Sequence, residues 1–141
     1  MLCSLTAAAL VLTACGGSDD NNTPADLAGS SAKLAVLSTT DLHTNILGYD
    51  YFKLAADPNY GFDRTATLIR SARSEFANSL LVDNGDTIQG TALADYQAQV
   101  SPLPCTQQLA MYKAMAVLKY DAGTLGNHEF NYGLPFLNQV L

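Results

Sequence analysis

The sequence predicts an α/β domain in which strands alternate with helices and form a mainly parallel sheet. Apolar runs of strand length lie at residues 33–38, 79–83 and 121–125. Segments with helical periodicity separate them, at residues 63–76 and about 106–120. A chain that passes from strand to helix to strand returns in the same direction, so that neighbouring strands are parallel and helices cover the sheet.

The first two elements are a strand and an amphipathic helix. Lys33–Ser38 (KLAVLS) is a short apolar run that ends in polar residues, which is typical of a buried strand. In the segment 63–76 we expect a helix with Asp63 as its cap. Four of the five residues on its inner face are apolar: Ala66, Ile69, Ala72, Arg73 and Phe76.

The remaining elements follow in the same alternation. Ser79–Asp83 (SLLVD) reads as a second strand, which Asn84-Gly85 closes. A further helix is expected from about Thr106 to Tyr120, and Asp121–Leu125 gives a weaker third strand. Pro135 suits the first turn of a last helix over 134–141.

Composition narrows the class of function. The 141 residues are 48% hydrophobic, which excludes a wholly disordered chain and allows one domain with a core. Seven Lys and Arg against thirteen Asp and Glu leave no basic surface for a nucleic-acid polymer. Small phosphate esters remain possible ligands, because bound metal ions can supply the positive charge that side chains do not. Three cysteines are too few and too scattered for a Cys-rich zinc site.

The amino end has the pattern of an export signal. The apolar run Leu5–Thr13 is too short to span ~30 Å of hydrocarbon but has the size of a signal-peptide core. Leu12-Thr13-Ala14-Cys15 resembles a bacterial lipobox, although the first basic residue is only Lys33. We expect a signal peptide at 1–14, lipidation of Cys15, a flexible linker at 15–32 and a folded domain at 33–141.

This pattern predicts an exported lipoprotein, anchored in a bacterial membrane through the lipid on Cys15 and facing the periplasm. The alternative is a cytoplasmic protein with an apolar amino end and one incidental cysteine. We favour the lipoprotein, because the apolar core, the small residues, the cysteine and the polar linker follow one another in the right order.

Polar residues follow each predicted strand, where open α/β sheets bind their ligands. Asp41 and His43 follow the first strand, Asp86 the second, and Asn127 with His128 the third. Taken singly, each has an ordinary explanation, such as a turn or a surface histidine. Together they offer oxygen and nitrogen ligands without sulfur, which favours Mn²⁺, Zn²⁺, Co²⁺ or Fe.

Such a ligand set suits two-metal hydrolysis of phosphoesters. Two cations ~3.5–4 Å apart share a bridging ligand, for which Asp86 is the natural candidate. Asp41 and His43 would then hold one metal and Asn127 the other. His128 would stabilise charge on the phosphoryl group or protonate the leaving oxygen.

Three segments resemble the first three motifs of the calcineurin-like metallophosphoesterases, D-x-H, G-D and G-N-H-[DE]; they are TTDLHTN, VDNGDTIQG and GTLGNHEFNYG. Within that family the chain is most similar to the bacterial 5′-nucleotidase superfamily, in its branch of periplasmic 2′,3′-cyclic-nucleotide 2′-phosphodiesterases/3′-nucleotidases. The resemblance runs from Lys33 to Leu141. It implies the amino-terminal part of a four-layer α/β/β/α sandwich, two divalent ions (Mn, Co, Zn or Fe), and 2′,3′-cyclic nucleotides and 3′-nucleotides as substrates.

Residues that match a family motif are expected to have the role that the family gives to that motif position. Asn131 stands where the 5′-nucleotidase branch has an Asp that orients the histidine, whereas GNHEFN is familiar from the cyclic-phosphodiesterase branch. Asp83 and Glu129 are interpreted as structural. The resemblance implies that Asp41 and His43 are ligands of the first metal. It implies that Asp86 bridges the two metals and that Asn127 is a ligand of the second. It also implies that His128 is the catalytic histidine and that Asn131 orients it.

Later motifs of the family, G-H and G-H-x-[HQ], have no counterpart, since no histidine follows His128. A carboxyl-terminal domain that binds the nucleobase is also expected in the missing remainder of the polypeptide. We therefore expect the 141-residue chain alone to be inactive. Two further interpretations stay open: a non-catalytic truncated lipoprotein with partial metal binding, and a 5′-nucleotidase/UDP-sugar hydrolase.

Overall fold

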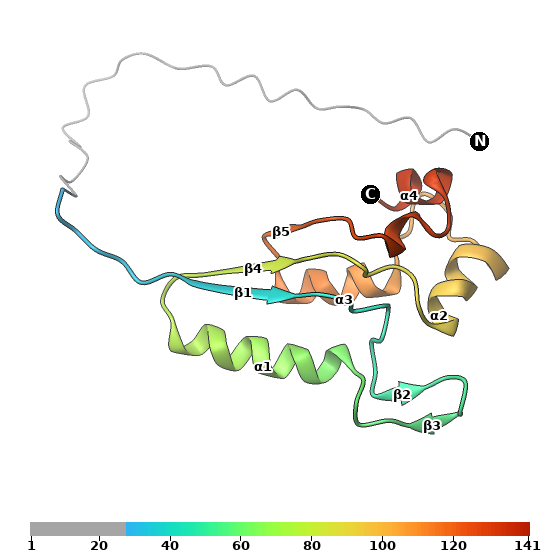
Figure 1. Cartoon of the computed structure of the whole chain (residues 1–141), viewed down its shortest axis with the longest axis horizontal. Coiled ribbons are helices and arrows are strands. Elements are labelled where there is room, and N and C mark those ends of the chain that lie inside the picture. The colour runs from blue at the N-terminus through green and yellow to red at the C-terminus, as the bar shows by residue number, and fades with distance from the viewer. Residues whose placement is uncertain (1–27) are drawn as a thin grey trace, which may run out of the picture. The chain divides into compact units, whose positions relative to one another are not determined.

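The computed structural model describes residues 28–141, within which Lys33–Leu141 form one unit (Figure 1). Its centre is a sheet of three strands, β1 (Ala35–Thr39), β4 (Ser79–Asp83) and β5 (Ala122–Gly123), in the order β1-β4-β5. Both pairs are parallel, with Ala35 opposite Ser79 and Val82 opposite Ala122. The predicted α/β class with a parallel sheet is confirmed.

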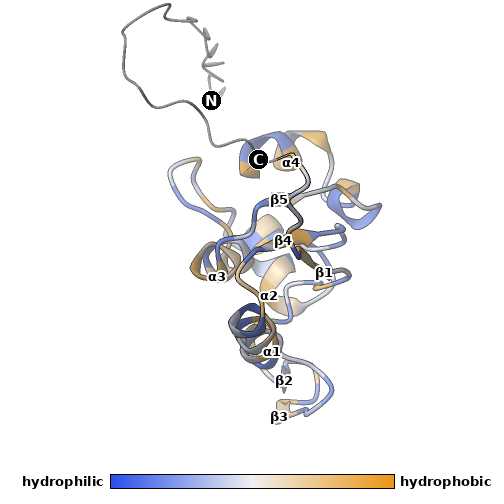
Figure 2. Cartoon of the chain, turned by 90° about the vertical axis from the view of Figure 1, so that its left-hand side faces the viewer, coloured by the Kyte–Doolittle hydropathy of each residue, from blue (hydrophilic) through white to orange (hydrophobic). Residues whose placement is uncertain are grey.

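Two helices cover one face of this sheet: α1 (Phe62–Glu75) and α3 (Ala110–Leu118). Figure 2 shows hydrophobic and hydrophilic residues on different sides of α1, whereas α3 (AMYKAMAVL) is mostly hydrophobic, with Val117 69% exposed. The helices bury their apolar sides against Leu37 of β1 and Leu81 of β4. Strand residues of opposite parity point away from the helices, and Val36 and Leu80 remain 63% and 41% exposed. The buried core under the helices consists of Phe62, Ala66, Ile69, Leu81, Met111 and Leu118.

A second core forms after β4. Ile88 packs with Leu109, with Phe136 and Leu137 of α4 (Leu134–Val140), and with partly buried residues around them. Between Ile88 and Leu109 the chain makes α2 (Ala92–Asp95), which continues as a π-helical turn over Tyr96–Val100. The second core therefore holds the segment after β4 against the carboxyl end of the chain.

The ends of the predicted helices and of two strands need correction. The helix predicted at 63–76 begins at Phe62; Gly61 is its N-cap, and Asp63 makes no capping bond and lies in the first turn. The helix predicted at 106–120 covers only Ala110–Leu118, because a turn closed by the Gln107 N–H to Pro104 carbonyl bond precedes it. The first strand lies at 35–39 rather than 33–38, and the third shortens to Ala122–Gly123.

Three short elements were not predicted. A hairpin of β2 (Tyr49–Asp50) and β3 (Ala55–Ala56) follows the loop after β1, with Tyr49 opposite Ala56. The α2 helix with its π-turn is the second, and a 3₁₀ turn over His128–Phe130 is the third. Each is too short to show a hydrophobic period in the sequence.

No helix among residues 28–141 has the length and apolar character needed to cross a membrane. The predicted signal peptide (1–14), Cys15 and most of the predicted linker lie outside the described residues. Export and lipidation therefore stay predictions from the sequence.

Candidate metal centre

The loops after β1 and β4 are paired beyond the ends of the strands. The N–H of Asp41 donates to the Gly85 carbonyl (3.0 Å), and the N–H of His43 donates to the Asp86 carbonyl (3.0 Å). These bonds extend the parallel pairing of β1 and β4, in which Thr39 lies opposite Asp83. Because both loops follow the carboxyl ends of parallel strands, their polar side chains meet at one edge of the sheet.

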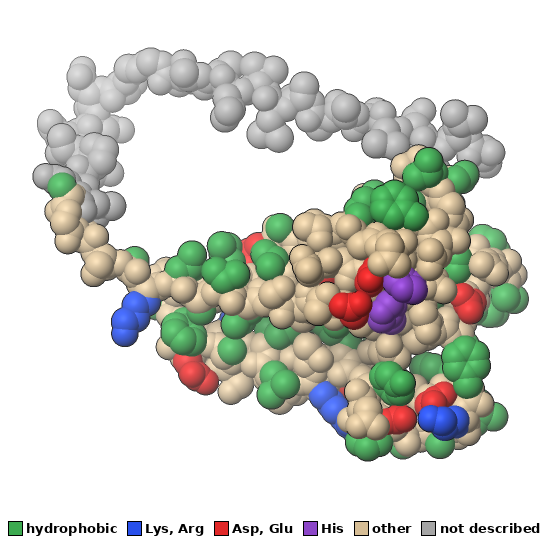
Figure 3. All heavy atoms as spheres, viewed as in Figure 1, with side chains coloured by type: hydrophobic (Ala, Val, Ile, Leu, Met, Phe, Trp, Pro, Cys, Tyr) green, Lys and Arg blue, Asp and Glu red, His purple; other side chains and the backbone are tan. Residues whose placement is uncertain are grey.

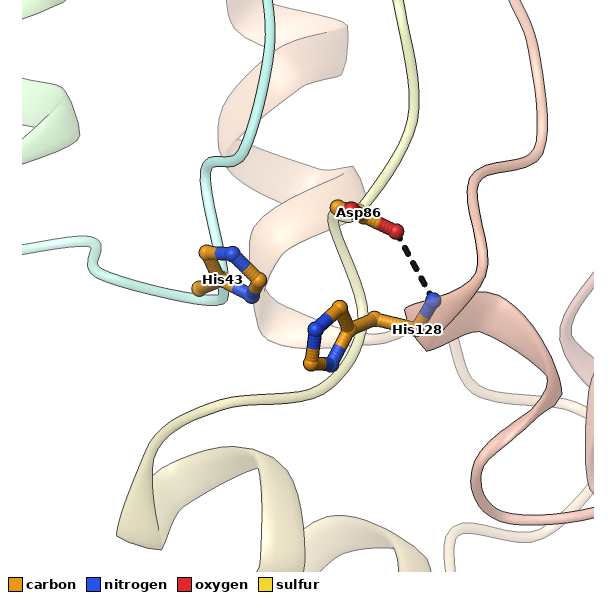
Figure 4. Close-up of side chains that lie close together, drawn as sticks. All are labelled: His43, Asp86 and His128. Atoms are coloured by element: carbon orange, nitrogen blue, oxygen red, sulfur yellow. Dashed lines mark hydrogen bonds between the residues drawn. The ribbon is translucent and has the colours of Figure 1, made fainter.

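Three side chains from three loops converge there: His43, Asp86 and His128. One ligand atom from each lies within 4.8 Å of the others, and all three residues are half-buried. The backbone N–H of His128 donates to Asp86 Oδ1 (2.7 Å), the dashed contact in Figure 4. The two imidazole rings meet edge to face, with centroids 4.7 Å apart. In Figure 3 the histidines appear on the surface beside acidic side chains.

His43 is oriented through its Nδ1 atom, which lies 2.7 Å from the backbone carbonyl of Gln89. A carbonyl only accepts, so in the neutral ring Nδ1 carries the proton and Nε2 has a free lone pair. Nε2 lies 3.6 Å from Asp41 Oδ1. A neutral imidazole nitrogen and a carboxylate turned toward each other are a donor pair that fits a divalent transition metal.

His128 is held by a side chain. Its Nδ1 lies 2.5 Å from Gln89 Oε1 and 3.1 Å from Asn131 Nδ2, and Asn131 Nδ2 also donates to Gln89 Oε1 (3.2 Å). Gln89 thus contacts both histidines, one through its backbone and one through its amide. Nothing in the sequence pattern singled out Gln89; its place in the loop that begins with Asp86 was the only available signal.

The backbone of these loops is strained. Asp41, His43, Thr44 and Asp86 have φ angles of 54°, 46°, 56° and 58°, in the left-handed region. For residues other than glycine this region costs roughly 1–2 kcal/mol each. Such conformations gather at functional sites, where surrounding bonds hold them in place. In this site, the bonds between the loops hold these residues.

A buried carboxylate fixes the remaining loop. Glu129 is 1% exposed, and it accepts four backbone N–H bonds at 2.5–3.2 Å. Burial raises the pKa of the Glu129 carboxyl, but the four N–H donors outweigh burial, so that its pKa lies below its ordinary value. Glu129 therefore ties the loop after β5 to the loop after β4, and the structural interpretation of this residue agrees with the contacts. Its four donors are the N–H groups of Asp86, Thr87, Ile88 and Gly126.

Asp83 has a similar role at the end of β4. It is 4% exposed, and its carboxylate accepts from the hydroxyls of Thr39 and Thr87 (both 2.6 Å) and from the N–H of Gly85 (3.1 Å). These bonds connect the end of β1, the end of β4 and the loop that carries Asp86. Asp83 faces inward and is fully engaged, in agreement with a structural role.

Gly126 is required by close approach. A Cβ atom at this position would lie 2.2 Å from Asp86 Oδ1 and 2.8 Å from Asp86 N. The loop after β5 therefore reaches Asp86 only because residue 126 lacks a side chain.

The predicted site residues fall into two groups. The structure brings His43, Asp86 and His128 together, and Asp41 Oδ1 lies 3.6 Å from His43 Nε2. Asn127 precedes His128 and is exposed; its carbonyl accepts the N–H of Phe130 (3.2 Å). Its role as a ligand, like the other assigned roles, stays a prediction.

A cavity of about 450 Å³ opens beside the two histidines. Gln89 and Gly90 form one side of it, and the β2–β3 hairpin supplies aromatic rings on the other. A cavity of this size could enclose much of a small organic ligand. The aromatic residues in its wall are Tyr49, Tyr51, Phe52 and Tyr60.

The fold and the site together indicate a metal-dependent phosphoesterase. A family model described as calcineurin-like phosphoesterase matches residues 34–140, and the chain belongs to this family. This membership confirms the predicted family and implies divalent metals. It also agrees with the three loops that meet at the sheet edge.

Comparison with individual proteins gives consistent results. The chain is 47% identical over 117 residues to a 2′,3′-cyclic-nucleotide 2′-phosphodiesterase/3′-nucleotidase of Salmonella typhimurium, covering 83% of this chain and 18% of that protein. It is 46% identical over 117 residues to the trifunctional nucleotide phosphoesterase protein YfkN of Bacillus subtilis, covering 81% of this chain and 8% of that protein. A crystal structure of calcineurin-like phosphoesterase YfkN from Bacillus subtilis aligns with a TM-score of 0.74 at 46% identity, covering 77% of this chain and 34% of that one. The chain thus spans less than a fifth of the length of these two curated relatives.

Proposed function

We propose that the chain contributes the metal-binding part of a phosphoester hydrolase that acts on 2′,3′-cyclic nucleotides and 3′-nucleotides. The observation that carries the proposal is the convergence of two metal donors, His43 and Asp86, with a third side chain, the imidazole of His128; one ligand atom from each lies within 4.8 Å of the others. The 47% identity to the Salmonella typhimurium enzyme supports this substrate class over other phosphoesters.

The donor groups divide into two sets around Asp86. Asp41 and His43 would hold one divalent ion, and Asn127 would contribute to a second. Asp86 uses Oδ1 for the His128 N–H, which leaves its other oxygen for a shared ligand position. When bound, divalent ions supply Lewis acidity toward a phosphoryl group and a nucleophile at neutral pH.

His128 lies beside this group of ligands without belonging to either set. We assign to it contact with the phosphoryl group and transfer of a proton at Nε2, since its Nδ1 is occupied by Gln89. The fixed ring avoids the entropy cost of orienting a free side chain during the reaction.

Metal binding is the first test. Titration of Mn²⁺ or Co²⁺ into the chain, followed by calorimetry, should show binding that weakens in Asp86→Asn by at least the roughly 10–100-fold that loss of an outer-shell partner costs. Asp63→Asn is the matched control, because Asp63 is exposed in the first turn of α1 and should leave binding unchanged. Equal binding by wild type and Asp86→Asn would contradict the assignment.

Hydrolysis is the second test. Release of phosphate or nucleotide from 2′,3′-cyclic AMP, 3′-AMP and 5′-AMP is measured with Mn²⁺ or Co²⁺, both for this chain and for any longer polypeptide found to contain it. We expect turnover of the first two substrates by the longer polypeptide and none by the 141 residues alone. A preference for 5′-AMP would support a 5′-nucleotidase instead, and metal binding without turnover in both would support the non-catalytic interpretation.

The coding DNA offers a quicker discrimination. Codons past position 141, read in all frames, should encode the G-H and G-H-x-[HQ] motifs that complete the second metal site in the family. Unrelated sequence there would favour a non-catalytic lipoprotein.

For the cellular location we propose a lipid anchor on Cys15 and exposure to the periplasm. The support is the lipobox-like Leu12-Thr13-Ala14-Cys15 after a short apolar run. Metabolic labelling with a fatty acid should mark wild type and not Cys15→Ser. Equal labelling of both would contradict the anchor.

A further inference from the structure

We infer that Gln89 is a positioning residue that fixes the tautomer and ring orientation of both histidines in this site. It holds His43 through its backbone carbonyl (2.7 Å) and His128 through its side-chain oxygen (2.5 Å). Both contacts are made at Nδ1. The inference rests on the site of the proposed function. It concerns only which nitrogen of each ring carries the proton, and therefore holds whether or not the chain hydrolyses a substrate.

The shortest contact at His128, to Gln89 Oε1, decides which ring nitrogen carries the proton. Gln89 Oε1 and Asn131 Nδ2 both approach His128 Nδ1, at 2.5 Å and 3.1 Å. Oε1 is an acceptor and Nδ2 a donor, so Nδ1 cannot satisfy both in the neutral ring. If Nδ1 carries the proton, it donates to Oε1, and Asn131 Nδ2 also donates to Oε1 (3.2 Å). If Nδ1 lacks the proton, Nδ1 and Gln89 Oε1 are both acceptors and face each other at 2.5 Å, which is unfavourable.

The amide of Gln89 therefore accepts two hydrogen bonds, one from His128 and one from Asn131. Asn131 Nδ2 lies near both partners, and with Nδ1 protonated it donates to Gln89 Oε1 (3.2 Å) and not to His128 Nδ1 (3.1 Å). This changes the role predicted for Asn131: a neutral amide at position 131 need not orient the ring, because Gln89 accepts the Nδ1 proton instead. His128 Nε2 is left as the ring nitrogen with the free lone pair.

Gln89 is itself held in place by its neighbours. Ile88 before it is 1% exposed in the second core, and its N–H donates to Glu129 Oε1 (3.2 Å). Gly90 after it has φ 140°, and a Cβ there would lie 2.8 Å from His43 Cβ. The backbone at 89–90 thus packs against the His43 ring, which fixes the carbonyl that accepts from Nδ1.

The composition of the chain makes this testable by nitrogen NMR. His43 and His128 are its only histidines. A chain labelled with ¹⁵N-histidine gives two ring systems, which His43→Gln assigns. The spectra compare the neutral tautomers of the two rings, at alkaline pH and with a chelator to remove metal. We expect both to show protonated Nδ1 and unprotonated Nε2.

Gln89→Leu removes the side-chain acceptor and keeps the backbone carbonyl. We expect the His128 Nδ1–H signal to be lost in favour of Nε2–H, while His43 keeps its Nδ1–H signal as an internal control for folding. Gln89→Glu retains an acceptor and should retain the His128 Nδ1–H signal. Asn131→Ala should also retain it, since Asn131 only donates to Gln89.

Three outcomes would overturn the inference: Nε2–H on His128 in the wild-type chain, no change of His128 in folded Gln89→Leu, or an equal change in Asn131→Ala. A measurement without variants covers the case in which Gln89→Leu does not fold. In wild type the His128 Nδ1 proton should give a nuclear Overhauser effect to the Gln89 side-chain amide protons, and its absence would count against the contact. None of these readouts requires metal or hydrolysis, so a failure of the proposed function would be seen separately.

Discussion

The carboxylate of Glu129 accepts the backbone N–H of Asp86 at 2.8 Å, so that a residue after β5 fixes the position of a predicted metal ligand after β4. Glu129 is adjacent in sequence to His128, whose own N–H donates to the Asp86 carboxylate. The loops after β4 and β5 are therefore bound to each other at both the backbone and the side chain of Asp86.

Glu129→Gln should lower the free energy of unfolding by about 2–4 kcal/mol, because a neutral amide replaces a buried carboxylate that accepts four N–H bonds. Urea denaturation followed by circular dichroism measures the loss. Glu75→Gln at the exposed end of α1 is the control and should change stability by less than ~0.5 kcal/mol. Similar stabilities of the two variants would show that the buried bonds contribute little.

Gly126→Ala should weaken Mn²⁺ or Co²⁺ binding about tenfold or more, because the new methyl group would lie 2.2 Å from Asp86 Oδ1 and displace the carboxylate. Calorimetric titration measures the affinity. Gly123→Ala in β5 is the matched control, since its nearest neighbours would be 3.9 Å away. An unchanged affinity in Gly126→Ala would place the metal away from Asp86.

Lys119→Gly should raise the free energy of unfolding by about 0.5–1 kcal/mol, against the usual direction of glycine substitutions. Lys119 ends α3 with φ 54°, in the left-handed conformation that glycine adopts without cost. The comparison in urea is with Lys119→Ala, which removes the same charge but keeps the strain. The glycine variant must be the more stable of the two for this account to hold.

Tyr112 should make stability fall at alkaline pH. Burial, with the nearby negative charges of Glu129 and Asp83, raises the pKa of Tyr112 to about 12 from 10.0. A raised pKa in the folded state stabilises that state below pH 10, and this contribution is lost as the pH rises through 12. Urea midpoints from pH 8 to 12 should fall less steeply in Tyr112→Phe than in wild type. Parallel curves would assign the alkaline loss to other groups.

The elements of the fold that could be predicted are those with a long hydrophobic period or an apolar run closed by turn residues. β4 was predicted with its observed bounds, because SLLVD is apolar and closed by Asn84-Gly85. α1 was predicted within one residue at each end from its apolar period. The β2–β3 hairpin could not be predicted, since two-residue strands show no alternation and their pairing depends on tertiary contacts.

The candidate site also has residues that could be predicted from the sequence and one that could not. Asp41, His43, Asp86 and His128 could be expected together, since each follows a strand of one parallel sheet. Gln89 could not, because its role arises from the path of a loop that brings both its carbonyl and its amide to the histidines. Loop geometry of this kind depends on Gly90, Glu129 and the second core rather than on any local spacing.

The pairing of the loops after β1 and β4 has a consequence for their motion. The N–H groups of Asp41, His43 and Thr44 all donate to carbonyls of the segment 85–87, at 2.9–3.0 Å, although none of them lies in a strand. Hydrogen exchange at these amides should therefore be slow, at rates close to those of the central strands, because the bonds open only when the sheet itself separates. The loops that carry the predicted metal ligands would then behave as an extension of the sheet, and we expect the mobility that lets a substrate enter in the β2–β3 hairpin, which also lines the cavity.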